Sequence, residues 1–145
     1  MARYSAGVKT TAGSTTLPLA ALAASASVGA KLREIGAFNT TNTAVDIKLV
    51  RLTTAGTPGA SQNEEKHDPD SATASCSFNT TYSSTAPTTT DLGYRAALGA
   101  AIGAGVIWTF GDQGLRVPTG VANGIGIVVE NGTGQALQVY AVWDE

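Results

Sequence analysis

The sequence predicts an all-β protein, an antiparallel β-sandwich with a jelly roll as the expected form. Three observations lead to this prediction. Short segments alternate apolar and polar residues, as half-buried strands do. Turn-forming residues separate these segments roughly every 8–12 positions, which is typical of sandwiches. Only one segment favours a helix. The 145 residues suit one domain.

The N-terminal segment is expected to contain an arm and the start of the domain. Residues 1–16 are rich in Gly, Thr and Ser, so we expect an N-terminal arm that becomes ordered on docking. Within it, Arg3–Lys9 is a strand candidate. Residues 17–145 are expected to form a single β-sandwich domain. In Thr16–Ala26, Thr16 suits an N-cap and Pro18 a first turn, which predicts at most one short helix, near residues 17–26.

The clearest strand is Val45–Leu52, where the apolar residues at 45, 47 and 49 alternate with Asp46 and Lys48. A second strand is expected at Leu32–Phe38. The link Asn39–Thr43 is short and polar, which predicts that the two strands form an antiparallel hairpin.

The C-terminal region repeats this pattern. Ile125–Glu130 and Leu137–Trp143 are predicted strands on either side of Asn131–Gly134. Asn and Gly tolerate the positive φ that tight turns need. We therefore expect a second hairpin at the C-terminus.

Weaker strands and two long polar connections fill the middle of the chain. The strand candidates are Ser75–Tyr82, Leu92–Leu98, Val106–Phe110 and Leu115–Val117. The connections are Thr53–Thr73 and Ser83–Thr90. Connections this long in a compact domain are usually functional or mobile.

The composition argues against two classes of partner. Charged residues make up 14% of the chain and the net charge is −2, and the nine basic residues are scattered. Nucleic-acid binding needs clustered Lys and Arg, so no nucleic-acid partner is expected. The least polar stretch, Ala96–Phe110, contains three glycines and is shorter than the ~20 residues of a membrane helix, so no membrane role is expected.

Residues with catalytic or metal-binding chemistry do not form a known pattern. His67 lies in the acidic segment Glu64–Asp70, whose spacing matches no calcium loop, and whether this loop binds an ion stays open. No Gly-x-Ser-x-Gly or phosphate-binding loop is present. Cys76 has no base or cation beside it and is expected to be a small apolar residue, buried or half-buried. We expect no enzyme, no metal and no cofactor. The alternative is a polysaccharide-cleaving enzyme that uses an acid pair drawn from Asp91, Asp112 and Glu130.

The aromatic residues and the low charge favour association. Trp108 and Phe110 share one face of a predicted strand, and their most direct interpretation is core. Aromatic and Arg residues also dominate protein interfaces, whose cores are poor in charge. The interface candidates are Tyr4, Trp108, Phe110, Arg116 and Trp143. We expect a homo-oligomeric structural protein; the alternative is a monomeric sandwich.

Four segments resemble small structural proteins of tailed bacteriophages. They are Leu32–Thr41, Lys48–Thr54, Gly105–Asp112 and Val139–Glu145. The resemblance implies a β-sandwich protein of the virion, assembled in the host cytoplasm, most directly a capsid decoration protein. It also implies a homo-oligomer, with a trimer favoured, that bridges subunits of the major capsid protein.

The alternative within this resemblance is a tail- or fibre-associated protein. Its polar loops Thr53–Thr73 and Ser83–Thr90 would then bind a carbohydrate of the host surface.

Overall fold

The computed structural model describes residues 1–145 and confirms the predicted fold class: it is all-β, without a helix, and it contains two antiparallel sheets. Its strands are β1 Arg3–Lys9, β2 Ala20–Ala23, β3 Ala30–Asn39, β4 Val45–Leu52, β5 Ala60–Ser61, β6 Glu65–Lys66, β7 Ser77–Thr80, β8 Thr89–Leu98, β9 Gly105–Thr109, β10 Leu115–Val117, β11 Gly124–Asn131 and β12 Leu137–Asp144. Every strand predicted from the sequence is present within a few residues.

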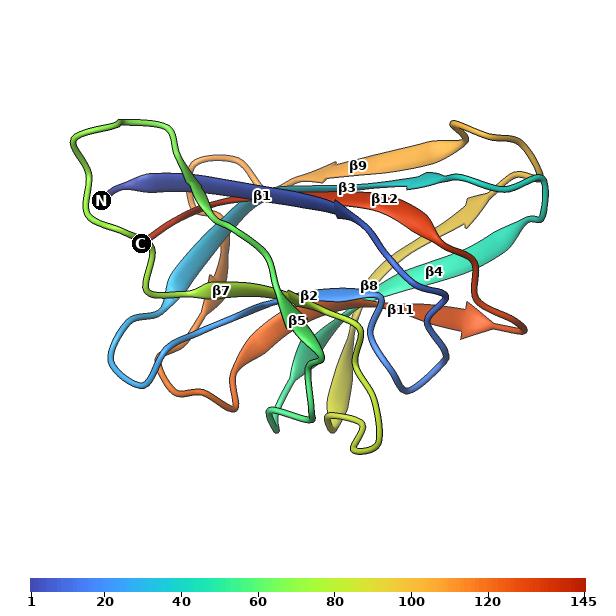
Figure 1. Ribbon diagram of the computed structural model, residues 1–145, viewed down its shortest axis with the longest axis horizontal. Coiled ribbons are helices and arrows are strands. Elements are labelled where there is room, and N and C mark those ends of the chain that lie inside the picture. Colours follow the sequence, from blue (N-terminus) through green and yellow to red (C-terminus); the bar gives the residue numbers. More distant parts are fainter.

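The two sheets face each other as a sandwich (Figure 1). The first sheet has the order β10-β3-β12-β1-β6, with β9 also paired to β3, and the second has the order β5-β7-β2-β11-β4-β8. The chain termini lie side by side (Figure 1), and Ala2 and Glu145 exchange backbone hydrogen bonds of 2.9 and 3.0 Å. The two ends of the chain are therefore held together at one end of the paired strands β1 and β12.

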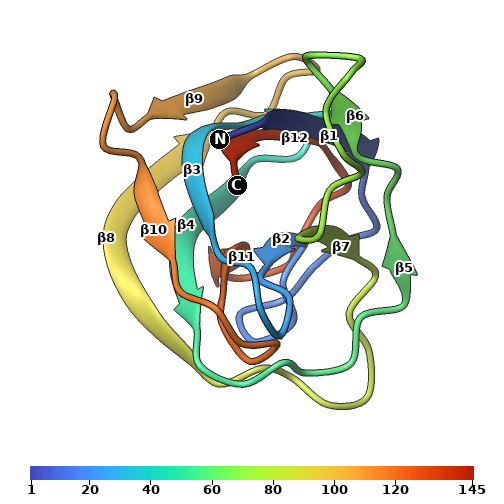
Figure 2. The same ribbon diagram turned by 90° about the vertical axis from the view of Figure 1, so that its left-hand side faces the viewer.

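Strands from the first part of the chain pair with strands from the last part in reverse order. β1 pairs with β12, β2 with β11, β3 with β9 and β4 with β8. The chain is thus one long antiparallel ribbon whose successive pairs alternate between the sheets, and Figure 2 shows it wound around the interior. Winding also places β12 beside β3 and β11 beside β4.

The core lies between the inner faces of the sheets. The alternation expected in β4 and β12 is present: Ile47 and Leu49 are fully buried, and so are Leu137 and Trp143. Tyr4 stacks on Trp143 with ring centroids 6.0 Å apart. A smaller apolar cluster lies on the outer side of the second sheet and consists of Ala21, Val50, Leu52, Tyr82 and Val128, with Leu17 packed against it.

Both predicted hairpins are wrong. β3 and β4 lie in different sheets, and so do β11 and β12, so the links between them cross the sandwich. Each of these strands has an apolar face, and placing consecutive strands in opposite sheets turns both faces toward one core. A short polar link permits either arrangement. At the first crossing, Asn39 Nδ2 donates to the carbonyl oxygens of Thr43 (2.7 Å) and Gly99 (3.0 Å).

The helix expected near residues 17–26 is also absent, and β2 occupies this segment. β2 pairs with β7 on one side and β11 on the other, and its backbone bonds to both neighbours replace those of a helix. Ala20 and Leu22 face the main core and Ala21 faces the smaller cluster. Burial on both faces therefore overrides the helix propensity of alanine.

The expected N-terminal arm is wrong for residues 3–9. These residues form β1, which is paired with β12 along its whole length and with β6 on its other side. Tyr4 and Ala6 are buried in the core. The segment has few large apolar residues, but backbone hydrogen bonds to β12 and β6 also stabilise β1 in the sheet.

Candidate functional site

The five interface candidates from the sequence do not gather on one surface. Tyr4 is 2% exposed and Trp143 is fully buried, so both belong to the core. Trp108 and Phe110 are half-buried and pack against that core from the end of β9, where Phe110 meets Tyr94 edge to face at 5.3 Å. Arg116 is exposed on β10. The structure thus supports the core interpretation for the aromatic candidates.

The strongest candidate surface is the outer face of the first sheet. We call it the glycine face and define it by Gly7, Gly36, Phe38, Gly105, Ile107, Tyr140 and Val142. The register of β1, β12, β3 and β9 aligns Gly7, Tyr140, Gly36 and Ile107 in one row across the sheet. The adjacent row contains Gln138, Phe38 and Gly105.

The glycines let two aromatic rings lie across the sheet. A Cβ atom at Gly36 would overlap the ring of Tyr140, and a Cβ atom at Gly105 would overlap the ring of Phe38. Ile107 remains 51% exposed at the edge of the same face. The result is a flat, apolar surface, because each ring occupies the space that a side chain at the neighbouring glycine position would fill.

Tyr140 is fixed within this face. Its hydroxyl donates a hydrogen bond of 2.5 Å to Glu34 Oε1. Burial, and then the bond to this carboxylate, raise the pKa of Tyr140 to about 12. The phenol therefore stays neutral at physiological pH, and it engages the carboxylate of Glu34 on the face.

One end of the glycine face carries an ion-paired cluster. Asp144 is 5% exposed, and its carboxylate accepts hydrogen bonds from Arg3 Nε (2.7 Å) and Arg33 Nε (2.6 Å). The bond from Arg3 is the main reason why the pKa of Asp144 lies below its usual value. Arg33 also donates to the carbonyl oxygens of Gly111 and Asp112, so the cluster holds the turn that follows β9.

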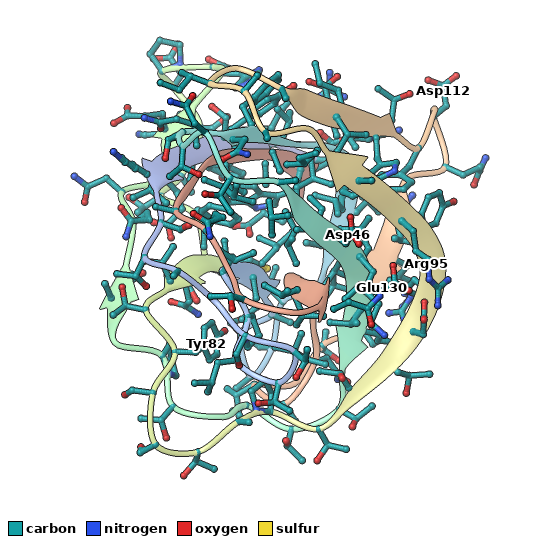
Figure 3. All side chains as sticks on the ribbon, turned by 90° about the vertical axis from the view of Figure 1, so that its right-hand side faces the viewer. Asp46, Tyr82, Arg95, Asp112 and Glu130 are labelled. Atoms are coloured by element: carbon teal, nitrogen blue, oxygen red, sulfur yellow. The ribbon has the colours of Figure 1, made fainter.

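The acidic residues suspected of catalysis do not form a suitable pair. Figure 3 shows Arg95 beside Glu130 on the outer side of the second sheet, with Asp112 apart from them. Arg95 forms ion pairs with both Glu130 and Asp91. A bond from the backbone N–H of Gly93 is the largest of the effects that lower the pKa of Asp91. A glycosidase needs one carboxyl with a raised pKa, whereas the pKa of Asp91 is shifted the other way and both Asp91 and Glu130 are bound by Arg95, so this pair fits a surface ion-pair network better.

The acidic loop and the cysteine have structural partners. Glu64 Oε1 accepts the N–H of Phe78 at 3.1 Å, and Lys66 Nζ donates to the carbonyl oxygen of Ser71 at 2.8 Å. No three His, Cys, Asp or Glu side chains are grouped in a way that could hold a metal ion. Cys76 is buried, as expected, and burial is the main factor that raises its pKa to about 12.

A polar depression adjoins the glycine face where the segment around β6 crosses β1. It has a volume of about 560 Å³ and is lined by Gln62, Asn63, Glu65 and His67 together with Tyr140. Amide, carboxylate and imidazole groups thus surround an aromatic side chain. Of the two polar connections expected to bind carbohydrate, only Thr53–Thr73 lines this depression.

The sequence reasoning missed the glycine face. A signal for it was present, because Gln138, Tyr140 and Val142 alternate with the core residues of the last strand and so lie opposite to them. Gly7 and Gly36, each inside a predicted strand, were a second signal, since glycine in a strand often marks close approach of other atoms.

Comparison of the chain with protein-family models, curated proteins and solved structures found no match. The chain also contains no helix that could cross a membrane.

Proposed function

We propose that this chain is a structural protein of a tailed-bacteriophage virion, assembled in the host cytoplasm, and that it decorates the capsid by bridging major capsid subunits. The glycine face carries this proposal. On this outer face of the first sheet, the side chains of Phe38, Ile107 and Tyr140 lie among glycine residues. Such a surface suits contact with another protein, because aromatic groups contribute much of the energy of protein interfaces.

The charges of this surface favour docking onto a flat partner. Asp144, Arg3 and Arg33 neutralise one another at one end, and Glu34 is engaged by Tyr140. Lys9, opposite Gln138, and Glu65, opposite Ser5, are exposed and have no ion pair, so a partner must leave these two charges in water or pair them to limit the desolvation cost of binding. On a shell, many such modest contacts act together through effective concentration.

The strand order supports the jelly-roll form of the sandwich. The pairs β1–β12, β2–β11, β3–β9 and β4–β8 are those of a long hairpin rolled over two sheets. The remaining short strands extend the sheets without breaking this order. Jelly rolls are common among viral capsid domains, which agrees with a virion role.

The first test is the copy number in purified particles of the phage that encodes the chain. A decoration protein is expected in hundreds of copies per particle by quantitative densitometry, and a tail component in a handful. Absence from the particles would overturn both.

The second test examines the glycine face directly. Gln138 is exposed beside Phe38 in the adjacent row, so Gln138→Lys adds a charge at this face without removing a core contact. We expect this variant to occupy undecorated shells at least tenfold less well than the wild type. Gln113→Lys makes the same change in the exposed turn after β9 and should bind normally. Equal binding of both variants would refute the role of this face.

A tail- or fibre-associated carbohydrate-binding protein is the second candidate, because the depression beside Tyr140 offers the groups that bind sugars. Host-surface polysaccharide should then bind the pure protein, as measured by calorimetry. Asn63→Ala and Glu65→Ala should each abolish that binding, while Gln113→Ala should not. No heat of binding would eliminate this candidate.

A further inference from the structure

The outer edge of β9 has free backbone hydrogen-bonding groups. Two bonds to β3 flank the strand, from Asn39 N to Ala104 O (2.7 Å) and from Phe110 N to Arg33 O (2.9 Å). With the register of β9 against β3, they show that Val106 and Trp108 direct their backbone groups toward β3. The N–H and C=O groups of Gly105, Ile107 and Thr109 therefore point away from the sheet, where they have no hydrogen-bond partner in the chain.

Every other sheet edge carries a feature that discourages pairing. β5 and β6 are two residues long. β10 has three residues, exposes Arg116 and is followed by Pro118. β8 is long, but it carries Asp91 and Arg95 and bulges at Gly93, whose φ is 83°. Charges, proline, bulges and short length are the means by which proteins protect edges, and β9 has only its modest length.

The free groups of β9 are self-complementary. In an antiparallel pair of two β9 strands centred on Ile107, each Ile107 faces the other, and Gly105 faces Thr109 of the second copy. All three residues direct their N–H and C=O groups outward, so every donor on one strand meets an acceptor on the other. This register leaves none of the outward groups unpaired.

We propose that β9 is a self-association edge: two copies of this chain pair their β9 strands antiparallel about a two-fold axis through Ile107, joining their first sheets. A second copy fits better than a charged strand of another protein. No charged residue occurs from Ala96 to Gly111, so self-pairing brings no like charges together. The side chain of Ile107, which is 51% exposed, gains an apolar partner.

The pairing deepens the proposed function, on which its role in a virion rests. It joins two glycine faces into one continuous platform, because Ile107 and Gly105 belong to both the edge and the face. A pair of five-residue strands buries less than the roughly 1,200 Å² of a stable interface, so it is expected to be weak in solution and stronger on a shell. A two-fold pair closes at two copies, which favours a dimer over the trimer expected from the resemblance.

A charge exchange at one position tests the register. Ile107→Lys and Ile107→Glu each place like charges opposite each other, and each should weaken dimerisation at least tenfold. An equimolar mixture should restore the dimer, since Lys then faces Glu. Light scattering up to about 1 mM should give twice the 14.6 kDa chain mass for the wild type and for the mixture. Val121→Lys, at a site 63% exposed on another loop, should dimerise like the wild type.

A disulfide cross-link can detect the β9–β9 dimer even if it is too weak to be seen by light scattering. Opposed residues of such a pair have Cα atoms about 5.5 Å apart, within the range of a disulfide. Ile107→Cys should therefore form a disulfide dimer on mild oxidation, and Val121→Cys should not. A trimer, a mixture that stays monomeric, or equal cross-linking of the two variants would overturn the inference. Normal shell occupancy by a variant that cannot dimerise would refute the role of the self-pairing on the shell and leave the decoration role intact.

Discussion

Asp144→Asn tests the ion-paired cluster that ties the two ends of the chain together and supports β9. The Asp144 side chain is 6% exposed, and it accepts three hydrogen bonds from guanidinium groups, at 2.6, 2.7 and 3.2 Å. Asparagine keeps the volume but loses the charge and turns an N–H₂ group toward one of the arginines.

The expected loss of stability follows from these contacts. Hydrogen bonds to charged groups contribute about 1.5–3 kcal/mol each. The arginine side chains are 49% and 20% exposed to solvent, which weakens their electrostatic attraction to Asp144. The amide oxygen of the asparagine can also still accept a hydrogen bond from one of the arginines. We therefore expect a loss of about 2 kcal/mol of unfolding free energy near pH 6, and a decrease in Tm of about 6 °C.

The pH dependence has a definite sign. The pKa of Asp144 is lower in the folded protein than in the unfolded chain, mainly because of the bond from Arg3. The stability that its charge contributes is therefore present above the unfolded pKa of about 3.9 and is lost as the pH falls through the folded value. The difference between wild type and Asp144→Asn should be complete at pH 6 and should shrink below about pH 4.

Urea unfolding followed by tryptophan fluorescence at several pH values measures this difference. The matched control is Asp112→Asn, at an exposed carboxylate in the turn after β9, which should change stability little at any pH. A gap between wild type and Asp144→Asn that stays constant from pH 6 to pH 3, or no gap at pH 6, would refute the reasoning.

Three further predictions concern the core and one strained turn. Trp143→Ala should lower the unfolding free energy by about 3–5 kcal/mol in urea titrations, because it empties a fully buried site; a loss below about 1 kcal/mol would contradict the core assignment. Cys76, whose pKa is raised to about 12, should not react with a thiol reagent at pH 8 until the protein unfolds, and rapid native reaction would contradict its burial. Thr81 has a φ of 56°, so Thr81→Asn should stabilise the protein by about 1 kcal/mol in thermal melts, whereas a loss would show that its side-chain contacts outweigh the strain.

Strand positions were predictable because alternation is a local property. Val45–Leu52 and Leu137–Trp143 show an apolar residue at every second position, and both became strands with one buried face. The same alternation places Tyr140 on the face of the last strand opposite to that of the buried Trp143, so this part of the glycine face could be predicted from the sequence. Its other half, Gly36 and Ile107, joins it only through the pairing of β3 with β12 and β9.

The sequence alone determined that this protein is all-β, where its main strands lie, and which of their faces is apolar, because each of these properties depends on neighbouring residues. Only the tertiary structure decided that Asn39–Thr43 crosses between sheets, that Ala20–Ala23 is a strand and that Arg3–Lys9 is paired on both sides. These choices depend on partners distant in sequence. Burying every apolar face against one shared core is a condition on the whole chain, and no single segment contains it.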